Sequence, residues 1–271
     1  MSLKSRQTIQ RLLRQVGLLR IADRLRYLVS VVRRHRRNQA FRAAHPEFEL
    51  PPNALAYDAY SAPDWTFYYR SGFETATFLA NIIVQQLPDT AGAVRILEWG
   101  CGPARVVRHL RTALNKPADI VACDYNAASI AWCAANIPDV RFFVNGLEPP
   151  LPFESGFFSF IYAISVLTHL SESVGRAWLV ELYRILRPGG VAVLTTNGDS
   201  MQSRLFPVEL KAYRNAEMVV RGKVEEGKRC FVAYHPPAYA EKQLFKQFQV
   251  LKHAPGAFPY TGQDYWVLKR Q

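Results

Sequence analysis

The sequence has few cysteines and no long apolar run. Its four cysteines, Cys101, Cys123, Cys133 and Cys230, form no Cys-x-x-Cys pair and have no metal-ligand spacing. This pattern favours reduced thiols in a cytosolic protein over a disulfide scaffold, and we expect no metal site. No stretch of 18 apolar residues is present, so the sequence predicts no transmembrane helix, and the apolar pieces near the N-terminus are too short for a signal-peptide core.

Acidic residues are almost missing from the first 42 positions. That segment holds 12 Lys or Arg and one acid, Asp23, whereas the remaining 229 residues hold 22 basic and 21 acidic residues. The net charge of +12 therefore belongs to the N-terminal segment. Because the body is near neutral, it does not favour a nucleic-acid-binding surface, and we do not expect nucleic acid as its partner.

Residues 1–44 are predicted to form a basic amphipathic helical arm. Two apolar helical faces are separated by Gly17: Ile9, Leu12, Leu13 and Val16 form the first, and Ile21, Leu25, Leu28 and Val32 form the second. Three interpretations fit this pattern. The arm is an anchor on an anionic membrane surface through residues 1–42, a helix pair that packs on the body or on a partner, or a cleaved mitochondrial presequence.

From Val94 onwards, strand-like and helix-like segments alternate, after a proline-rich linker (45–52) and a helical region (64–87). The predicted strands are 94–98, 120–123, 141–144, 157–163 and 191–195, and the predicted helices are 105–114, 126–135 and 172–186. Such alternation predicts a parallel sheet with helices on both faces. The remaining segments are a polar hairpin at 217–235, a helix at 238–248, and two closing strands at 249–253 and 265–269.

The stretch VRILEWGCGPARVVRHL joins the first strand to the first helix of this pattern. Gly100 and Gly102 let the backbone bend sharply and approach a ligand closely. A dinucleotide-binding fingerprint needs a third glycine at position 105, which is Arg105, and the Gly-Lys-Ser/Thr of a P-loop is absent. The lone Gly-x-Gly therefore leaves the nucleotide open.

Two carboxylates at strand ends narrow the choice of the bound nucleotide. Glu98 ends the first strand and Asp124 ends the second, and the carboxyl ends of parallel strands line one crevice. Asp124 suits the two hydroxyls of a ribose. Glu98 faces the glycine turn, where a cationic ligand is favoured over a pyrophosphate. A ligand with a ribose and a positive charge fits S-adenosylmethionine.

Several motifs then resemble those of one family in their order and spacing. ILEWGCGPAR resembles motif I of the class I S-adenosylmethionine-dependent methyltransferases, and VACDYN resembles their strand-two acid motif. NGLEPPLPF, FSFIYAISVLTHL and ELYRILRPGGVAVLTT resemble the later motifs, so the likeness covers about residues 90–200, and AEKQLFKQF and GQDYWVL resemble the antiparallel close of the fold. The chain is similar to the type 11-like methyltransferases. Ala104 departs from the third motif-I glycine, and Asn145 stands where the family often has an acid.

The resemblance implies an α/β fold, with a Rossmann-like doubly wound seven-stranded sheet whose last strand is antiparallel. It also implies the domain division. The arm at 1–44 is followed by a methyltransferase domain at 45–271, with a cofactor-binding core at about 90–200 and a substrate-side insertion at about 200–237.

The resemblance also assigns roles to residues. The expected cofactor-binding residues are Tyr69, Glu98, Gly100, Cys101, Gly102, Pro103, Asp124, Tyr125, Asn145, Gly146, Leu147 and Ser165. Residues 98–102 should border the methionine part, Asp124 the ribose, Tyr125 and residues 145–147 the adenine, and Ser165 the sulfonium. The alternatives are a structural turn for the glycines, a helix start for Asp124 and ordinary packing for Tyr125.

Two residues are candidates for proton transfer. His169 follows the fourth strand, and its ordinary pKa suits a general base for a hydroxyl nucleophile; Asp199, after the fifth strand, is a weaker candidate. A His that orients the loop or caps the next helix is the alternative for His169. Trp65 and Tyr68 are weaker candidates for covering the cofactor, and Tyr234, His235 and Asp264 for lining the acceptor site.

The sequence thus predicts a methyltransferase that uses S-adenosylmethionine. The expected acceptor is a hydroxyl on a glycan, a lipid-linked intermediate or another small molecule, because a basic amphipathic arm on a neutral body suits work at a membrane surface. The expected location is the cytoplasm, at the inner membrane surface if the arm binds lipid. Two alternatives stay open: a non-catalytic S-adenosylmethionine-binding or interaction module, and an RNA methyltransferase tethered by the basic arm.

Overall fold

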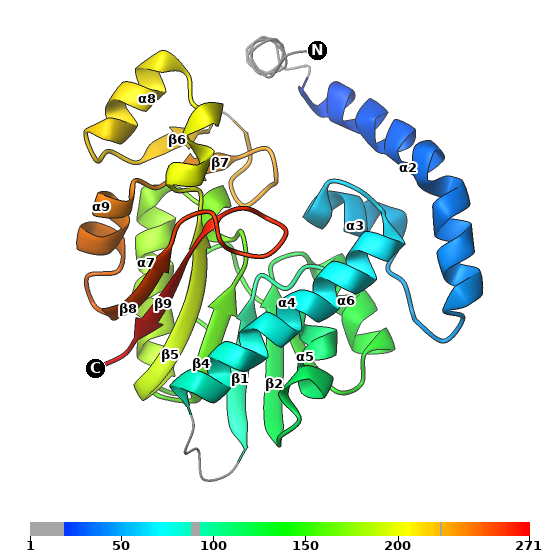
Figure 1. The fold of residues 1–271 in the computed structure, drawn as a ribbon, viewed down its shortest axis with the longest axis horizontal. Helices are drawn as coiled ribbons and strands as arrows, with labels where there is room; N and C mark the ends of the chain where they lie inside the picture. The colour runs from blue at the N-terminus through cyan, green and yellow to red at the C-terminus, as the bar shows by residue number, and fades with distance from the viewer. Residues whose placement is uncertain (1–18, 88–92, 223) are drawn as a thin grey trace. The chain divides into compact units, whose positions relative to one another are not determined.

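A computed structural model describes residues 19–87, 93–222 and 224–271 (Figure 1). The first predicted arm helix, around Ile9 to Val16, lies outside these residues. The chain forms two compact units, Met1–Tyr68 and Tyr69–Gln271. No helix within the described ranges is both long enough and apolar enough to cross a membrane.

The first unit contains α2 (Leu19–Ala44) and α3 (Asn53–Tyr60). The second predicted arm helix is therefore confirmed as α2. One face of α2 packs within this unit. The Tyr57 hydroxyl on α3 donates to Asp23 Oδ1 at 3.0 Å, and the Tyr27 and Tyr57 rings meet edge to face at 5.1 Å. Asn38 donates to the Pro63 carbonyl at 2.7 Å and fixes the segment that leads into the next helix.

The second unit is built on a seven-stranded sheet with the order β3-β2-β1-β4-β5-β9-β8. The strands are β1 (Val94–Trp99), β2 (Ala118–Asp124), β3 (Arg141–Val144), β4 (Phe158–Ala163), β5 (Leu186–Thr196), β8 (Gln249–Ala254) and β9 (Asp264–Lys269). β1 to β5 pair in parallel, and β9 pairs antiparallel with both β5 and β8. The predicted doubly wound sheet with an antiparallel last strand is confirmed.

Helices cover both faces of this sheet (Figure 1). On one face, α4 (Trp65–Gln86), α5 (Val107–Leu114) and α6 (Ala127–Asn136) share a core with alternate strand residues such as Ile96 and Ile120. On the other, α7 (Glu172–Ile185), α9 (Pro237–Tyr239) and the π-helical turn η3 (Ala240–Leu244) pack on residues such as Leu97 and Val121. The strands are buried on both sides because successive side chains point to opposite faces.

Local sequence signals explain several boundaries. Asn126 caps α6, because its side chain accepts hydrogen bonds from the amides of Ala128 and Ser129. Ser171 caps α7 in the same way through the Val174 amide. The helix predicted at 238–248 is wrong in length. α9 and η3 end at Leu244, and Phe245 and Phe248 turn back into the core beside β8.

The insertion after β5 forms a small layer beyond one end of the sheet (Figure 1). It contains the 3-10 helix η2 (Asp199–Arg204), α8 (Pro207–Arg214), and the antiparallel pair β6 (Val219–Arg221) and β7 (Val232–Tyr234). The predicted hairpin is confirmed, whereas η2 and α8 were not predicted. Met201, Leu205, Tyr213, Val219 and Tyr234 form a separate small core for this layer.

Candidate functional site

The turn after β1 is built by glycines that no other residue could replace easily. Gly100 has a φ of 77° and Gly102 a φ of 51°, both in the left-handed region. The amides of Gly100 and Cys101 donate to the Cys123 carbonyl at 2.8 and 3.0 Å, so the turn is tied to the end of β2. A Cβ on Gly100 would lie 2.3 Å from Val166 Cγ2, after β4. The turn therefore approaches both neighbouring strands closely.

Ala104 continues this turn in the left-handed region, with a φ of 56°. Its side chain is fully buried, and its amide donates to the Cys101 carbonyl at 3.0 Å. The left-handed conformation costs a residue with a Cβ about 1–2 kcal/mol. The turn thus keeps a shape that favours glycine although the third motif glycine is missing.

Asp124 joins the end of β2 to the glycine turn. Its Oδ2 accepts a hydrogen bond from the Gly102 amide at 2.8 Å, and its Oδ1 accepts one from the Asn126 amide, also at 2.8 Å. A carboxylate has about four acceptor positions, so it can hold the turn and still accept from ribose hydroxyls. The structure therefore brings Gly100, Gly102 and Asp124 together, as the sequence predicted.

Glu98 lies beneath the same turn and is almost fully buried. Its Oε2 accepts hydrogen bonds from the Tyr162 hydroxyl at 2.9 Å and the Val107 amide at 3.1 Å. Burial raises the pKa of Glu98 to about 8, although these hydrogen bonds and the charge of Arg105 act against the rise. The carboxyl group is therefore mainly protonated at neutral pH, and a cation bound at the turn would favour its ionised form.

The part of α4 from Tyr69 onwards packs against the segment that follows the turn. The Tyr69 ring meets the His109 ring edge to face at 5.5 Å, and Arg105 donates to Ser71 Oγ at 2.9 Å. A Cβ on Gly72 would lie 2.0 Å from the Arg105 carbonyl oxygen, so only glycine permits this approach. The structure thus places Tyr69 beside α5, whereas Trp65 and Tyr68 belong to the first unit.

Asn145 and its neighbours follow β3 at the same edge of the sheet. The Asn145 amide donates to the Asp124 carbonyl at 3.2 Å, and its side-chain Nδ2 donates to the Gly146 carbonyl at 2.6 Å. Its Oδ1 is buried and has no hydrogen-bond partner among the described residues. A buried acceptor without a partner is uncommon, and it suits the amino group of an adenine.

A segment of the insertion, residues 225–235, runs along this edge; we call it the strap. At one end the Tyr125 hydroxyl donates to the Gly227 carbonyl at 3.1 Å. A Cβ on Gly227 would lie 3.0 Å from Leu147 Cδ1, so Tyr125 and Leu147 flank the same glycine. The Gly227 amide donates to the His169 carbonyl at 2.9 Å, and at the other end the His235 amide donates to the Asn197 carbonyl at 2.9 Å. The strap therefore connects the ends of β2, β4 and β5.

His169 lies in η1 (Leu167–His169), directly after β4, and is half-buried beneath the strap. Its Nδ1 lies 2.6 Å from the Phe231 carbonyl oxygen. A carbonyl can only accept, so Nδ1 carries the hydrogen in this contact, and Nε2 is the basic nitrogen of the neutral ring. This tautomer suits a base that accepts a proton through Nε2.

Half-buried Ser165 begins a row of polar side chains that the sequence did not predict, and the other two members, Asn197 and Gln263, are buried. The Ser165 Oγ donates to Gln263 Oε1 at 2.9 Å, and Gln263 Nε2 donates to Asn197 Oδ1 at 3.2 Å. Ser165, Asn197 and Gln263 follow or precede β4, β5 and β9, three neighbouring strands. Gln263 is the second residue of the GQDYWVL stretch, which is the one sequence signal that could have pointed to it.

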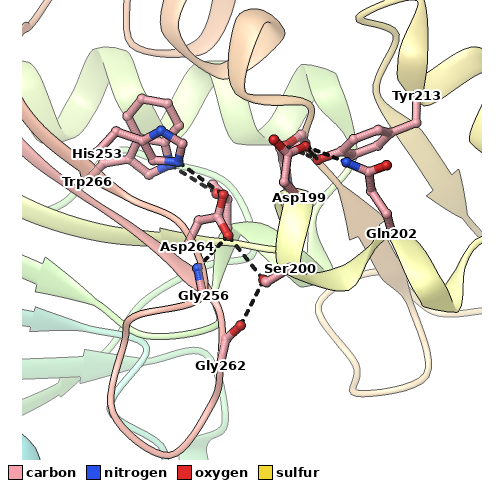
Figure 2. A network of polar contacts seen from close by, with 11 residues as sticks. Asp199, Ser200, Gln202, Tyr213, His253, Gly256, Gly262, Asp264 and Trp266 are labelled. Carbon is pink, nitrogen blue, oxygen red and sulfur yellow. Dashed lines mark hydrogen bonds and ion pairs between the residues drawn. The ribbon is translucent and has the colours of Figure 1, made fainter.

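Asp199 and Asp264 lie in separate polar networks (Figure 2). Asp199 is exposed, and its Oδ1 accepts from the Tyr213 hydroxyl at 3.0 Å and from Gln202 at 2.8 Å, both within the insertion. Neither Tyr213 nor Gln202 is a predicted cofactor residue. Asp264 is fully buried, and it accepts from Ser200 and the Gly256 amide and pairs with His253 at 3.0 Å. These contacts give Asp264 a structural role in joining β8 and β9 to the loop after β5.

The residues present fit S-adenosylmethionine. The turn at 100–104 offers close backbone approach, Asp124 offers carboxylate oxygens, and Asn145 Oδ1 offers a buried acceptor that lacks a protein partner among the described residues. Glu98 adds a group that ionises more readily beside a cation. These residues follow β1, β2 and β3, so they would hold the cofactor on one half of the sheet edge.

Comparison with known sequences points to the same family. Residues 96–190 match the model of a family described as a methyltransferase domain. The chain is 34% identical to a phthiotriol/phenolphthiotriol dimycocerosates methyltransferase of Mycobacterium ulcerans over 37% of its own length and 36% of that protein. It is 28% identical to a malonyl-[acyl-carrier protein] O-methyltransferase of Enterobacter lignolyticus over 48% and 49% of the two lengths. The chain spans about half the length, or less, of these curated relatives.

Solved structures share the fold. The S-adenosylmethionine-bound amino pentose methyltransferase CalS10 of Micromonospora echinaspora superposes with a TM-score of 0.53 at 18% identity, over 76% of this chain and 96% of that one. DesVI of Streptomyces venezuelae superposes with a TM-score of 0.55 at 15% identity, over 83% and 100%. The matched residues, the motif order and the strand order together support a class I S-adenosylmethionine-dependent methyltransferase domain in this chain, with S-adenosylmethionine as its cofactor.

Proposed function

We propose that this protein transfers the methyl group of S-adenosylmethionine to a hydroxyl group of a small molecule, such as a glycan or a lipid-linked intermediate. The observation that carries this proposal is the position and tautomer of His169. The residue follows β4, the strand beside β1, and so lies next to the strand ends that suit the cofactor, and its basic nitrogen is Nε2. A base in this place favours an acceptor that must lose a proton, as a hydroxyl does.

When bound, S-adenosylmethionine supplies a methyl group that is already activated by its sulfonium. The protein therefore contributes mainly alignment. The turn at 100–104 and Asp124 would fix the cofactor, the strap would border the acceptor, and His169 Nε2 would receive the hydroxyl proton as the oxygen–methyl bond forms. Asp199 is the weaker candidate for this step, since its partners Tyr213 and Gln202 belong to the insertion.

The relatives support methyl transfer but not one acceptor. Their names include an O-methyltransferase and a sterol 24-C-methyltransferase of Schizosaccharomyces pombe. The likeness lies mainly in the core, since the family model ends at residue 190. The acceptor is then selected by segments outside the matched core, of which the strap is the one nearest His169.

The test is formation of S-adenosylhomocysteine with panels of hydroxyl compounds and their amino analogues, using the full chain. We expect turnover with hydroxyl compounds, and at least a hundredfold lower kcat for His169→Gln with unchanged S-adenosylmethionine affinity. A preference for the amino analogues would contradict the hydroxyl proposal. Tight cofactor binding without turnover on either panel would favour a non-catalytic binding module.

We also propose that the arm attaches the protein to an anionic membrane surface on the cytoplasmic side. The predicted apolar face of α2 is not the face that packs within the first unit. Its side chains are largely exposed: Ile21 60%, Leu25 60%, Leu28 53% and Val32 75%. The neighbouring Val29 is also 48% exposed. The helix carries eight arginines and one acid, Asp23, which is hydrogen-bonded to Tyr57 on the opposite face. An exposed apolar stripe among arginines complements anionic lipid headgroups.

Vesicle sedimentation tests the arm. The full chain should bind phosphatidylserine-containing vesicles, and Val32→Asp should weaken this binding at least fivefold. Val208→Asp on α8 is a matched control, because Val208 is 74% exposed and lies in the other unit. Equal binding by both variants would contradict the membrane proposal. Salt-sensitive binding to RNA instead would favour a nucleic-acid tether.

A further inference from the structure

The place of the acceptor follows from the place of the cofactor. The groups that fit S-adenosylmethionine follow β1, β2 and β3, so the methyl group must be directed at the other half of the same sheet edge. That half is formed by the ends of β4 and β5 and the start of β9, covered by the strap. A residue that receives the acceptor should therefore lie there, and it should have hydrogen-bonding capacity that the protein itself does not use.

The strap residue His235 is held in this half by the row of polar side chains described above. Ser165 bonds to Gln263, and Gln263 bonds to Asn197. Asn197 Nδ2 then donates to the Ala233 carbonyl at 2.9 Å, and the Asn197 carbonyl accepts from the His235 amide at 2.9 Å. The Tyr213 hydroxyl, which donates to Asp199, also lies 3.3 Å from the His235 carbonyl oxygen and can share its hydrogen with it. The backbone of His235 is thus fixed on both sides.

The Nδ1 atom of the His235 ring, by contrast, has no hydrogen-bond partner among the described residues. The residue is 2% exposed, and its Nδ1 is buried with no hydrogen bond to any of the described residues. Burial alone lowers the pKa of His235 to about 4, so the ring is neutral at physiological pH. A buried polar nitrogen that lacks a partner costs free energy, and such groups commonly mark a binding role.

We propose that His235 is an acceptor-binding residue, whose Nδ1 forms a hydrogen bond with a neutral hydroxyl group of the methyl acceptor. This inference rests on the proposed function and adds a residue to it. No charged side chain among the described residues contributes to the pKa shift of His235, so its surroundings favour an uncharged group over an ion. His169 would then receive the proton of the reacting hydroxyl, and His235 would position the acceptor.

His253 provides a matched contrast, because it is a histidine of the same unit whose ring has both a polar and an aromatic partner. Its Nε2 pairs with the buried Asp264 at 3.0 Å, and its ring stacks on Trp266 with the centroids 3.8 Å apart (Figure 2). Loss of this ring leaves a buried carboxylate without its partner. Leucine should therefore lower Tm at position 253. At position 235 it removes an unpartnered polar group and should leave Tm unchanged or raise it.

The experiment uses the full chain loaded with S-adenosylhomocysteine and two neutral hydroxyl probes, phenol and cyclohexanol. Each is compared with its methyl ether, which lacks the donor. In histidine labelled with 15N, we expect the hydroxyl probes, and not the ethers, to shift the Nδ1 resonance of His235. We expect His235→Leu to weaken probe binding at least fivefold at an unchanged Tm, and His235→Gln to restore it to within threefold. His253→Leu should lower Tm and leave probe binding within twofold.

Two results would overturn the inference. One is a His235→Leu variant that loses as much Tm as His253→Leu, which would mean that the ring is structural. The other is the absence of any shift at His235 with both hydroxyl probes, or equal probe binding by the wild type and His235→Leu. If S-adenosylhomocysteine still binds in those cases, only the role of His235 fails. If the chain does not bind S-adenosylhomocysteine, the proposed function fails first.

Discussion

The two halves of the sheet edge, formed by the ends of β1 to β3 and by the ends of β4, β5 and β9, are held together by different kinds of contact. On the β1–β3 half, the contacts are mainly between backbone groups and one carboxylate, as in the bonds from Gly102 and Asn126 to Asp124. On the β4–β5–β9 half, side chains bond to side chains far away in sequence, and Ser165 and Gln263 are 98 residues apart. The first half offers a fixed backbone shape to a fixed ligand. The second offers side-chain groups that can change without changing the fold.

This difference explains why the β1–β3 half, which we call the cofactor half, has a recognisable sequence motif, whereas the β4–β5–β9 half, the acceptor half, has none. A backbone turn needs glycine at defined positions, so its sequence pattern is short and easily recognised. A buried row of amide side chains needs only that donors meet acceptors, and many combinations of residues achieve this. The cofactor half is therefore expected to be sensitive to backbone changes, and the acceptor half to single side-chain changes.

The largest expected effect comes from a substitution in the turn after β1, in the cofactor half of the sheet edge. Gly100→Ala forces a Cβ into a left-handed residue and within 2.3 Å of Val166 Cγ2. We expect a loss of roughly 2–5 kcal/mol in the free energy of unfolding, from conformational strain and overpacking, together with loss of cofactor binding. Urea unfolding and calorimetry measure both.

Gly189→Ala is the matched control for this change. Gly189 has a φ of 72°, but a Cβ there would meet nothing within 4 Å. It should lose only the conformational part, about 1–2 kcal/mol, and keep cofactor affinity. Equal losses at both positions would show that the close approach of the turn to Val166 is unimportant.

A second prediction concerns acid pH and tests both halves. Burial lowers the pKa of His235 to about 4, and burial with the charges of Arg108 and Arg105 lowers the pKa of His109 to about 4. Between this value and the ordinary value near 6.5, the unfolded chain binds more protons than the folded one. Each histidine should therefore lower the free energy of unfolding by a few kcal/mol as the pH drops through this window, whereas the raised pKa of Glu98 acts in the opposite direction.

Urea unfolding at several pH values measures this slope. His235→Leu should remove the contribution of His235, so its free energy of unfolding should fall less than that of the wild type as the pH drops, while His109 and Glu98 still contribute. If the slope of His235→Leu equals that of the wild type, the His235 ring is not held neutral by the fold.

A third prediction concerns Glu98 and tests whether a cation bound in the cofactor half ionises its carboxyl group. Its raised pKa of about 8 means that it is mainly protonated at pH 7. The sulfonium of S-adenosylmethionine should lower this pKa and release a fraction of a proton, whereas neutral S-adenosylhomocysteine should release less. Calorimetry in two buffers of different ionisation enthalpy measures the released protons. Glu98→Gln should abolish the difference between the two ligands, and a difference that persists in Glu98→Gln must come from another group.

The smallest expected effect concerns Ala104. Replacement by glycine removes the strain of a left-handed alanine but adds freedom to the unfolded chain. We expect Ala104→Gly to raise the free energy of unfolding by about 0.5 kcal/mol and to leave cofactor affinity equal or higher. A clear loss of stability would mean that the buried Ala104 methyl group contributes more through packing than its backbone conformation costs.

The sequence predicted most of the sheet because its signals are local. Alternating strands and helices and the cap at Asn126 each depend on a few adjacent residues. The glycine turn and Asp124 were also predictable, since they belong to one motif order. Their roles toward the cofactor stay predictions, as do the domain boundary at residue 44 and the base role of His169.

The acceptor half could not be predicted in the same way. Its contacts join Asn197 to Ala233 and Ser165 to Gln263, and no spacing rule in one sequence connects such pairs. The helix predicted at 238–248 failed for a related reason. Its apolar period is that of a helix, but Phe245 and Phe248 are used to close the core against β8 and α7. Tertiary packing there outweighs local propensity.

The most direct test of the cofactor assignment is calorimetric titration of the full chain with S-adenosylmethionine, beside Asp124→Ala and Asp119→Ala. Asp119 lies near the opposite end of β2, where it pairs with Arg141 at the surface, so it controls for loss of a carboxylate from the same strand. We predict micromolar binding by the wild type and Asp119→Ala, and at least tenfold weaker binding by a folded Asp124→Ala. Equal affinity in all three proteins, or no binding by the wild type, would contradict the placement of the cofactor at the ends of β1, β2 and β3.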